Sequence, residues 1–290
     1  MASIRNPVEW TAEQIRMSAR YVGSASRSVG GAEPRSRHSL PAVRQISLAD
    51  LREVLARGVD DFMAFRTDVV FICILYPVIG VVLSRLAFRH ELVPLLFPMA
   101  SGFALVGPAA AVFLYEMSRM RERGETVTWG RAFRSLGRPG FASLVILGLM
   151  LAAVFLLWLI AAQAIYSLTL GPEPPAGLDP FIRDIFTTAA GWTMLIAGLA
   201  TGALFAVLVL ATSVVSFPLL LDRDVGVRVA VLTSVRVVGA NPGPMLAWGA
   251  IVAGGLLLGS IPLFVGLIVV MPILGHSTWH LYRKVCAPSA

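Results

Sequence analysis

Residues 141–165 read FASLVILGLMLAAVFLLWLIAAQAI, a run that contains neither a charged residue nor a proline. Crossing the hydrocarbon core of a bilayer, about 30 Å thick, takes about 20 helical residues at about 1.5 Å each. This run therefore predicts a transmembrane helix. The whole chain has the composition of a membrane protein, because 57% of its 290 residues are hydrophobic and only 14% are charged.

Further apolar runs lie on both sides of this segment. Two precede it and are separated by a short polar patch, which predicts a helical hairpin. The run from Thr188 to Leu221 is longer than one span needs, which indicates tilt or a projecting end. The last block, Met245 to Trp279, is too long for one span, and Gly259-Ser260-Ile261-Pro262 interrupts it. The sequence thus predicts six spans, at about residues 69–86, 92–115, 141–165, 188–221, 245–259 and 262–280.

The basic residues are divided unequally between the two sides of this arrangement. Of the 24, 21 lie on one side, and only Arg85, Arg89 and Arg183 lie on the other. Positive charge is retained on the cytoplasmic side, so both termini are expected in the cytoplasm. The net charge of +7 is then explained by anionic lipids at the cytoplasmic face. Basic residues interleaved with aromatics, as in nucleic-acid binding, are not evident, so we expect no nucleic-acid partner.

The first 45 residues are polar and rich in arginine, with no apolar segment of the kind found in a signal peptide. We expect residues 1–45 to form a partly disordered cytoplasmic arm, 46–285 the membrane domain and 286–290 a tail. The first span would serve as the insertion signal, which favours the inner membrane of a bacterium. The two cysteines, Cys73 and Cys286, form neither a disulfide framework nor a metal pair.

An amphipathic helix is expected to precede the first span. Ser47 and Asp50 have the spacing of a capping box. Apolar residues then recur at helical spacing: Leu48, Leu51, Leu55, Val59 and Phe62. Comparable segments, 128–136 and 225–238, precede the second and third pairs of spans. The predicted fold class is all-α, a polytopic membrane bundle of six transmembrane helices arranged as three hairpins, each preceded by a cytoplasmic amphipathic helix.

Proline and glycine mark positions along the predicted spans. The second span of each hairpin has a proline in its cytoplasmic half: Pro108, Pro218 and Pro272. Two glycine pairs have the spacing that lets helix backbones approach closely: Gly198 with Gly202, and Gly255 with Gly259. We expect these glycines to pack the bundle, and a glycine-lined substrate route is the alternative.

The ionisable residues of greatest interest lie near the cytoplasmic ends of the even-numbered spans: Glu116, Asp222 and His276. If the helices converge, these residues could form a polar site for a proton, a metal or a lipid head group, because ionisable groups near hydrocarbon are costly without a partner. The alternative is that they pair at the water interface with Arg119, Arg223 or the backbone. His276 and His280 share one helix face, but no third ligand is nearby, so no metal or cofactor is expected.

Common catalytic motifs are missing from the sequence. It contains no P-loop, no dinucleotide-binding glycine pattern opening a helix, no HExxH and no Gly-x-Ser-x-Gly. ATP-driven pumping within this chain is therefore excluded. A haem-copper oxidase core is excluded as well, because it needs several histidines inside the membrane, whereas His38 is in the N-terminal arm and His90 is in an outer turn.

Five separated motifs look familiar together. They are Ile4-Arg5-Asn6-Pro7, Arg66-Thr67-Asp68-Val69-Val70-Phe71, Gly102-Phe103-Ala104-Leu105-Val106-Gly107-Pro108, Ser216-Phe217-Pro218-Leu219-Leu220-Leu221-Asp222-Arg223 and Gly275-His276-Ser277-Thr278-Trp279-His280-Leu281-Tyr282-Arg283. With these motifs in this order, the chain resembles the bacterial integral membrane proteins grouped as domain-of-unknown-function family 2189. The resemblance covers nearly all of residues 46–285 and implies an inner-membrane protein with no assigned activity.

Three classes of function remain. A structural or accessory component of a membrane complex is favoured, because no convincing buried polar site is evident and the basic N-terminal arm is exposed. Its partner would be another membrane protein. A small-solute or lipid transporter is the alternative, suggested by the repeated hairpins and the helix prolines. An enzyme acting on lipid at the interface would have to use Glu116, Asp222 and His276 and is the least favoured class.

Overall fold

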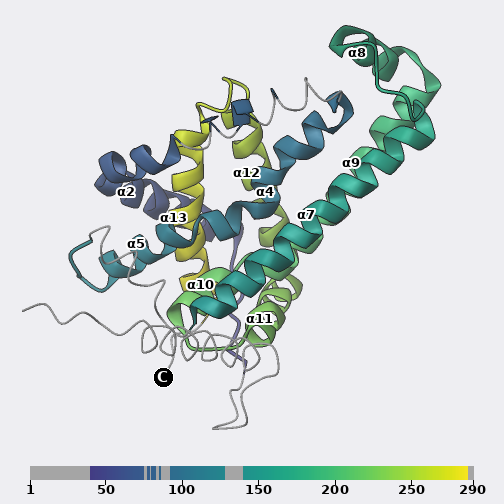
Figure 1. Cartoon of the computed structure of the whole chain (residues 1–290). Coiled ribbons are helices and arrows are strands. Elements are labelled where there is room, and N and C mark those ends of the chain that lie inside the picture. Colours follow the sequence, from purple (N-terminus) through teal and green to yellow (C-terminus); the bar gives the residue numbers. More distant parts are fainter. Residues whose placement is uncertain are drawn as a thin grey trace, which may run out of the picture.

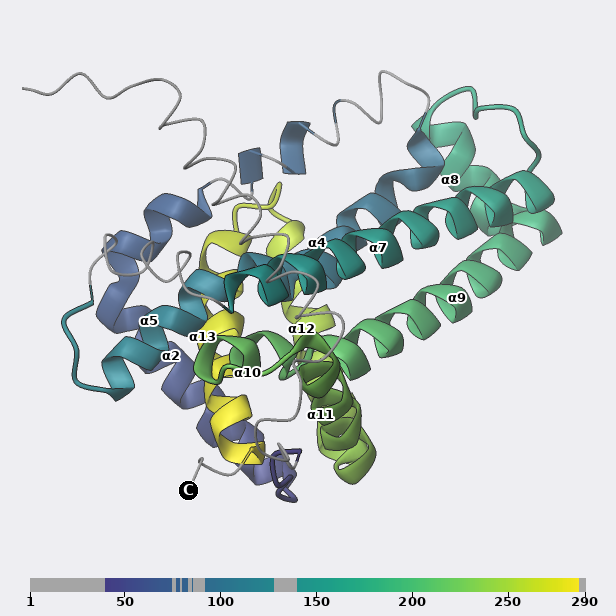
Figure 2. The ribbon, with the colours of Figure 1, turned by 60° about the horizontal axis from the view of Figure 1, so that its bottom comes forward.

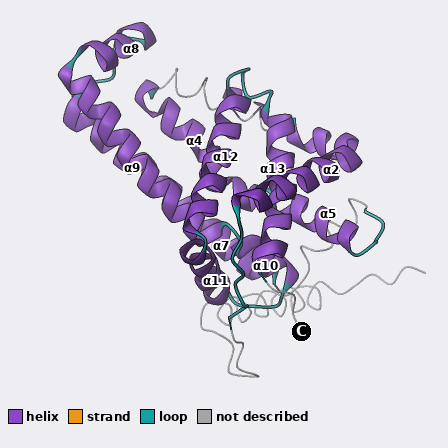
Figure 3. Cartoon of the chain, turned by 180° about the vertical axis from the view of Figure 1, so that it is seen from behind, coloured by secondary structure: helices purple, strands orange, loops and turns teal. Residues whose placement is uncertain are grey.

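The uncharged runs of the sequence become the longest helices of the protein. The computed structural model describes residues 40–74, 77–78, 80–82, 85, 92–127 and 140–286, and Figure 3 shows helices joined by loops throughout this part of the chain. Three helical segments are long and apolar enough to cross a membrane. They are α7 (Phe141–Thr169), α9 (Ala189–Ser213) continued by α10 (Ser216–Asp222), and α12 (Pro242–Ser260). The described part of the chain is therefore all-α, with several helices able to span a bilayer.

Helices α7 and α9 form a long hairpin that extends away from the other helices and carries α8 (Leu178–Thr187) at its tip (Figure 1). The Thr188 hydroxyl caps α9 by accepting a hydrogen bond from the backbone N–H of Gly191, at 2.9 Å. A Cβ at Gly191 would lie 2.1 Å from the carbonyl oxygen of Asp184. Glycine is therefore required where α8 turns back onto α9.

The other main pair is α2 (Leu48–Cys73) with α13 (Leu267–Val285), which run antiparallel. Figure 2 shows the two helices side by side. They cross at Gly58, where an added Cβ would lie 1.9 Å from the Ser277 hydroxyl oxygen and 2.9 Å from the carbonyl oxygen of Ile273. The ends of the pair are joined as well, since the backbone N–H of Arg44 donates to the carbonyl of Val285 at 2.8 Å.

The capping box predicted at the start of α2 is confirmed. The backbone N–H and the hydroxyl of Ser47 both donate to the Asp50 carboxylate, at 2.7 and 2.8 Å. The predicted apolar face of the helix is only partly right, because Leu48 is 60% exposed and Val59 is 40% exposed. Leu51 and Phe62 are buried as predicted, and Val54, Gly58 and Asp61 are buried as well. The buried face is rotated because α13 packs closest at Gly58.

The run predicted as one span over 92–115 is divided in the structure. A short 3-10 helix, η1 (Val93–Leu95), leads into α4 (Leu96–Ala110), and a turn at Ala111 separates α4 from α5 (Val112–Glu122). Pro108 lies inside α4 and has no backbone N–H for the helical ladder, which accounts for an interruption here. Helix α4 also holds the long hairpin, because the indole N–H of Trp158 on α7 donates to Ser101 at 2.9 Å.

The run predicted over 188–221 is interrupted in the same way. Helix α9 ends at Ser213 and α10 begins at Ser216, two residues before Pro218. The predicted amphipathic helix at 225–238 is present as α11 (Val227–Ala240). Its C-cap residue, Asn241, joins α11 to the segment before α2, because its side chain accepts from the N–H of Ile46 at 2.8 Å and donates to the carbonyl of Arg44 at 3.1 Å.

The predicted break in the last apolar block is confirmed, because α12 ends at Ser260. The next helix, α13, begins at Leu267 and not at Pro262, since residues 261–266 form a turn in which Leu263 and Phe264 have positive φ angles. The C-terminal half of α13 carries His276, His280 and two basic residues, so it is less apolar than the three candidate spans.

Several predictions from the sequence fall on other parts of the chain. The N-terminal arm up to residue 39, the amphipathic segment 128–136 and much of the predicted span 69–86 lie outside the described residues. The predicted helix at residues 92–115 contributes only the shorter apolar helix Val93–Gly102. The six-span arrangement and its three hairpins therefore stay a prediction, of which three spans are supported by helix length and composition.

Candidate functional site

A cluster of buried polar side chains lies where α2, α5 and α13 meet. Its centre is Asp61, which is 4% exposed. One carboxylate oxygen, Oδ2, accepts a hydrogen bond from the Ser118 hydroxyl at 2.5 Å and lies 2.9 Å from Nε2 of His280. The other, Oδ1, accepts from Arg121 at 2.5 Å. The Ser118 oxygen lies 2.8 Å from Nδ1 of His276. These five residues are called the Asp61 cluster.

The positions of the hydrogens in this cluster follow from its contacts. Ser118 has one hydroxyl hydrogen, and the Asp61 carboxylate can only accept, so this hydrogen goes to Asp61. Nδ1 of His276 must then donate to the Ser118 oxygen, and a neutral His276 ring has no hydrogen on Nε2. His276 is fully buried, and among the described residues its Nε2 has no hydrogen-bond partner. Ser118 therefore lies between the acid and the imidazole.

The surroundings of Asp61 favour its ionised form. Burial alone would raise the pKa of Asp61, but the hydrogen bonds from His280 and Ser118 outweigh burial and lower the pKa from 3.8 to about 2. Because the folded-state pKa is below the unfolded value, ionised Asp61 stabilises the fold fully above about pH 4. That contribution is lost as the pH falls through about 2.

A second cluster, called the Asp222 cluster, joins the ends of α5, α10 and α13. The Tyr282 hydroxyl donates to Asp222 at 2.8 Å, and Arg123 and Arg283 lie 3.4 and 3.6 Å from the same carboxylate. Arg283 also donates to Glu122 at 2.9 Å. The indole N–H of Trp279 donates to the other oxygen of Glu122, at 3.0 Å. Helix α13 thus presents polar residues to three neighbouring helices at once.

The three residues singled out from the sequence occupy three different settings. Glu116 receives two hydrogen bonds from the guanidinium of Arg119, each 2.7 Å long, and both side chains are buried. Asp222 belongs to the Asp222 cluster, and His276 belongs to the Asp61 cluster. In the described part of the chain no group of three His, Cys, Asp or Glu residues could hold a metal ion. These three residues were expected to form one polar site if the helices converge. In the structure they have different partners, and a functional role for them stays a prediction.

Asp61 and Ser118, two members of the Asp61 cluster, were not predicted from the sequence as functional residues. Asp61 lies on the amphipathic helix α2, on which the acidic residues Asp50, Glu53 and Asp60 are not buried. Its position three residues after Gly58, which faces α13, is the sequence signal that could have marked it. Ser118 directly precedes Arg119 in α5 and carries no comparable signal.

The glycines and prolines singled out from the sequence have distinct surroundings. An added Cβ at Gly202 would lie 3.2 Å from Trp158, whereas at Gly198 it would meet no described atom within 4 Å. Gly255 and Gly259 both face α13. An added Cβ would lie 3.3 Å from Val270 at Gly255 and 2.8 Å from Leu267 at Gly259. Pro272 lies inside α13, Pro218 is buried in α10, and Pro108 lines a cavity.

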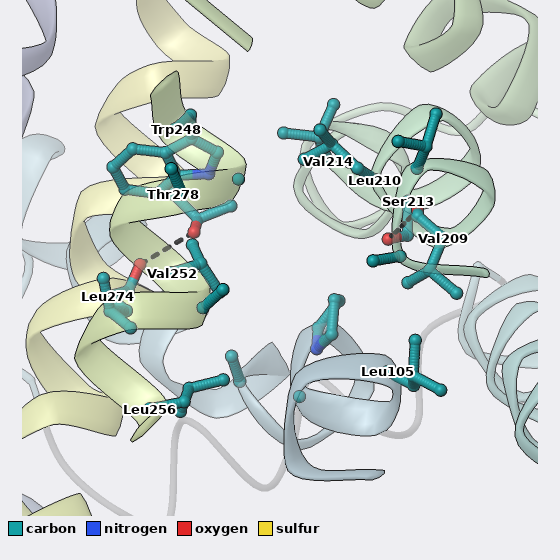
Figure 4. A pocket seen from close by; sticks show the side chains of 18 of the residues that line it. Leu105, Val209, Leu210, Ser213, Val214, Trp248, Val252, Leu256, Leu274 and Thr278 are labelled. Atoms are coloured by element: carbon teal, nitrogen blue, oxygen red, sulfur yellow. Dashed lines mark hydrogen bonds between the residues drawn. The ribbon is translucent and has the colours of Figure 1, made fainter. Parts of the chain in front are cut away.

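This cavity has a volume of about 420 Å³ and is enclosed by α4, α9, α12 and α13. Figure 4 shows Trp248, Val252 and Leu256 of α12 facing Val209, Leu210 and Val214 across the open space. The described residues that line it include no Asp, Glu, Lys, Arg or His. The cavity is therefore a separate, uncharged site beside the two polar clusters.

Comparison with known proteins identifies the family. Residues 96–222, which comprise α4 to α10, match the model of a family described as predicted integral membrane protein, DUF2189. Searches of curated proteins and of solved structures found no significant match. The matched stretch contains Glu116 and Asp222 as well as two of the three candidate spans. The resemblance inferred from the sequence motifs is thereby confirmed over residues 96–222, the stretch of this chain that matches the DUF2189 family of predicted integral membrane proteins.

Proposed function

We propose that the protein is a non-catalytic, multi-pass component of a bacterial inner membrane that helps to assemble or stabilise a membrane complex. The Asp61 cluster is the observation that carries this proposal. A serine nucleophile needs a base strong enough to remove its hydrogen. Here the acceptor of the Ser118 hydrogen is Asp61, whose lowered pKa makes it a weak base, and His276 donates to the serine oxygen. The cluster therefore contains a serine, a histidine and an aspartate, as a catalytic triad does. In a triad, however, the serine donates to the histidine, whereas here it donates to the aspartate.

Three further acids support the same proposal, because each is matched by a cation of the chain. Glu116 pairs with Arg119, Glu122 with Arg283, and Asp222 with Arg123 and Arg283. In some proteins, ionic groups of this kind fix one arrangement of the chain and add little net stability. We infer that the Glu122 and Asp222 pairs hold α5, α10 and α13 in one arrangement, as a scaffold requires, and that the Arg121–Asp61 pair adds α2.

The long hairpin offers a surface for a partner within the membrane. In the most apolar part of α7, only 22% of the residues are buried within the chain. Leu149, Leu156 and Ile160 are each about 60% exposed or more. In a bilayer this face contacts either lipid tails or another membrane protein. The proposed partner is a membrane protein that packs against α7, with anionic lipids bordering the basic end of the bundle.

The finer topology is part of the proposal: six spans, with both termini in the cytoplasm. The distribution of charge supports it, because α8, which carries Arg183, lies at the opposite end of the long hairpin from α10 and α11 (Figure 1). A reporter that is active only in the periplasm, fused after Ala290, should stay inactive, while the same reporter inserted after Gly177 should be active. An active fusion after Ala290 would contradict the proposed topology.

The assembly role predicts a stoichiometric partner. Tagged full-length protein, extracted with mild detergents or with a membrane-solubilising polymer, should retain one membrane protein at a constant ratio. The double substitution Leu149→Trp and Leu156→Trp should release this partner, because it adds bulk to the exposed face of α7. Leu257→Trp with Leu258→Trp, on the exposed face of α12, is the matched control and should not. A chain that is recovered alone from all these extractions would refute the assembly role.

Lipid transport is the second candidate function, and the cavity between α9 and α12 favours it. An uncharged cavity beside two candidate spans is more suited to a lipid than to an ion or a polar solute. Transport would also need a second conformation that opens the cavity toward the other leaflet. Accessory function needs no such change, which is why we place it first.

A further inference from the structure

We infer that the cavity between α4, α9, α12 and α13 is a binding site for an uncharged, single-chain lipid that carries a hydroxyl group. This inference goes beyond the proposed function and does not depend on it. Volume is the first argument, because about 420 Å³ is within the range of pockets that hold small ligands. An empty void of this size would deprive its lining of dispersion contacts, and its apolar walls would not hold water.

The opening of the cavity indicates where its occupant comes from. Ala203, Ala206 and Val207 of α9 line the cavity and are also exposed, as are Leu246, Ala250 and Ala253 of α12. The mouth therefore lies between α9 and α12, which are both long and apolar enough to span the membrane. A molecule entering between two such helices comes from the bilayer and not from water. Four of these six residues are alanines, which obstruct the mouth little.

The two ends of the cavity differ in polarity. One end is formed by Leu105, Leu256 and Met271 and is entirely apolar. The other end carries Ser213, Trp248 and Thr278, and Figure 4 shows Trp248 and Thr278 at the opposite end from Leu256. A lipid would place its chain toward Leu105 and its polar group toward Trp248.

The polar end can both donate and accept hydrogen bonds. Trp248 is 2% exposed overall and lines the cavity, and its indole nitrogen is not among the fully buried polar atoms without a partner. An indole N–H usually has a hydrogen-bond partner, so this donor is available to a molecule in the cavity. The Ser213 and Thr278 hydroxyls donate their hydrogens to the carbonyls of Val209 and Leu274, at 2.6 and 2.7 Å. Their oxygens can still accept.

A ligand hydroxyl matches this arrangement, because it can accept from Trp248 and donate to Ser213 or Thr278. A phosphate or a carboxylate does not match, since the lining provides no cation and burying an unpaired charge is costly. The geometry thus selects a long-chain alcohol or a monoacylglycerol over a phospholipid head group. The chain of a phospholipid whose head group stays outside is the competing occupant.

Photolabelling of the full-length protein can test this inference. The protein would be reconstituted into vesicles of phosphatidylethanolamine and phosphatidylglycerol that contain a trace of a long-chain alcohol with a diazirine in its chain. The expected result is labelling of peptides from α9 and α12 that unlabelled alcohol suppresses. Ala253→Phe, which fills the mouth, should abolish this labelling, whereas Ala153→Phe, on the exposed face of α7, should leave it unchanged. Ala203→Phe fills the mouth from the opposite wall and decides the matter if Ala253→Phe fails to fold.

The polar end has its own test. Trp248→Phe should weaken labelling by the alcohol about fivefold, the equivalent of one hydrogen bond of about 1 kcal/mol. The same substitution should not change labelling by the corresponding alkane probe, which has no oxygen to accept a hydrogen bond from the indole. Equal labelling of the cavity by a phospholipid carrying the same diazirine would overturn the inference in favour of a non-selective alkyl pocket. Labelling that neither mouth-filling variant reduces would overturn it altogether.

Discussion

Replacement of Asp61 by alanine is expected to lower the free energy of unfolding by about 3 kcal/mol, the lower end of the cost of breaking a buried ion pair. The carboxylate accepts hydrogen bonds from Ser118 and Arg121 and contacts His280. Its removal leaves these groups without their common acceptor. The loss is at the lower end because the Arg121 side chain is 44% exposed and can turn to water. In detergent, the midpoint of thermal unfolding should fall by about 6 °C.

The neighbouring residue provides the control. Asp60 has the same side chain on the same helix but is exposed. Asp60→Ala should change the midpoint by less than about 1 °C, since surface substitutions usually alter stability by about 0.5 kcal/mol or less. Equal effects of the two alanine substitutions would show that the Asp61 cluster does not hold α2 against α5 and α13.

Gly58→Ala is expected to destabilise the protein by about 2 kcal/mol, a typical cost of overpacking a tight contact. The added methyl group would lie 1.9 Å from the Ser277 hydroxyl oxygen and within 2.9 Å of backbone atoms of α13. The hydroxyl could rotate away, but the backbone could not, so α2 and α13 would have to separate. At a helical position with free space, a glycine-to-alanine substitution should stabilise the protein instead, because alanine is more favourable than glycine in a helix by about 1 kcal/mol.

Gly239 in α11 is such a position, since an added Cβ would meet no described atom within 4 Å. Gly239→Ala should therefore raise the unfolding midpoint while Gly58→Ala lowers it. Combining Gly58→Ala with Ser277→Ala should recover part of the loss, because the closest contact is then removed. A stabilising effect of Gly58→Ala would contradict the close crossing of α2 and α13.

Local features of the fold could be predicted from the sequence. The capping box at Ser47 depends on residues three positions apart, and the end of α12 at Ser260 depends on a short Gly-Ser-Ile-Pro motif. The apolar runs correctly indicated α7, α9 and α12, because length and hydropathy alone decide whether a helix can cross a bilayer. The division of residues 92–115 at Ala111 was missed, although Pro108 was recognised, because a proline allows a kink as well as a break.

The polar clusters could not be predicted, because their members are far apart in the sequence. Ser118 is separated by 57 residues from Asp61 and by 158 from His276. Which face of α2 is buried was decided by the close approach at Gly58, and a rotation of about one residue moves Asp61 from water into the core. The cavity could not be predicted from the sequence either, because the alanines of α9 and α12 are equally compatible with helix packing and with lipid contact.

The position of α13 in the sequence has a consequence for biosynthesis. Asp61 is inserted early, but two of its contacts, His276 and His280, belong to a helix that follows all the other described helices. Until α13 is made, Gly58 faces no helix, and Asp61 lacks both imidazoles. The translocon or a chaperone must then tolerate a helix with an incompletely paired acid, and tertiary folding of the described helices becomes complete only after synthesis has passed residue 285. Nascent chains stalled before α13 should accordingly be targets of membrane quality control.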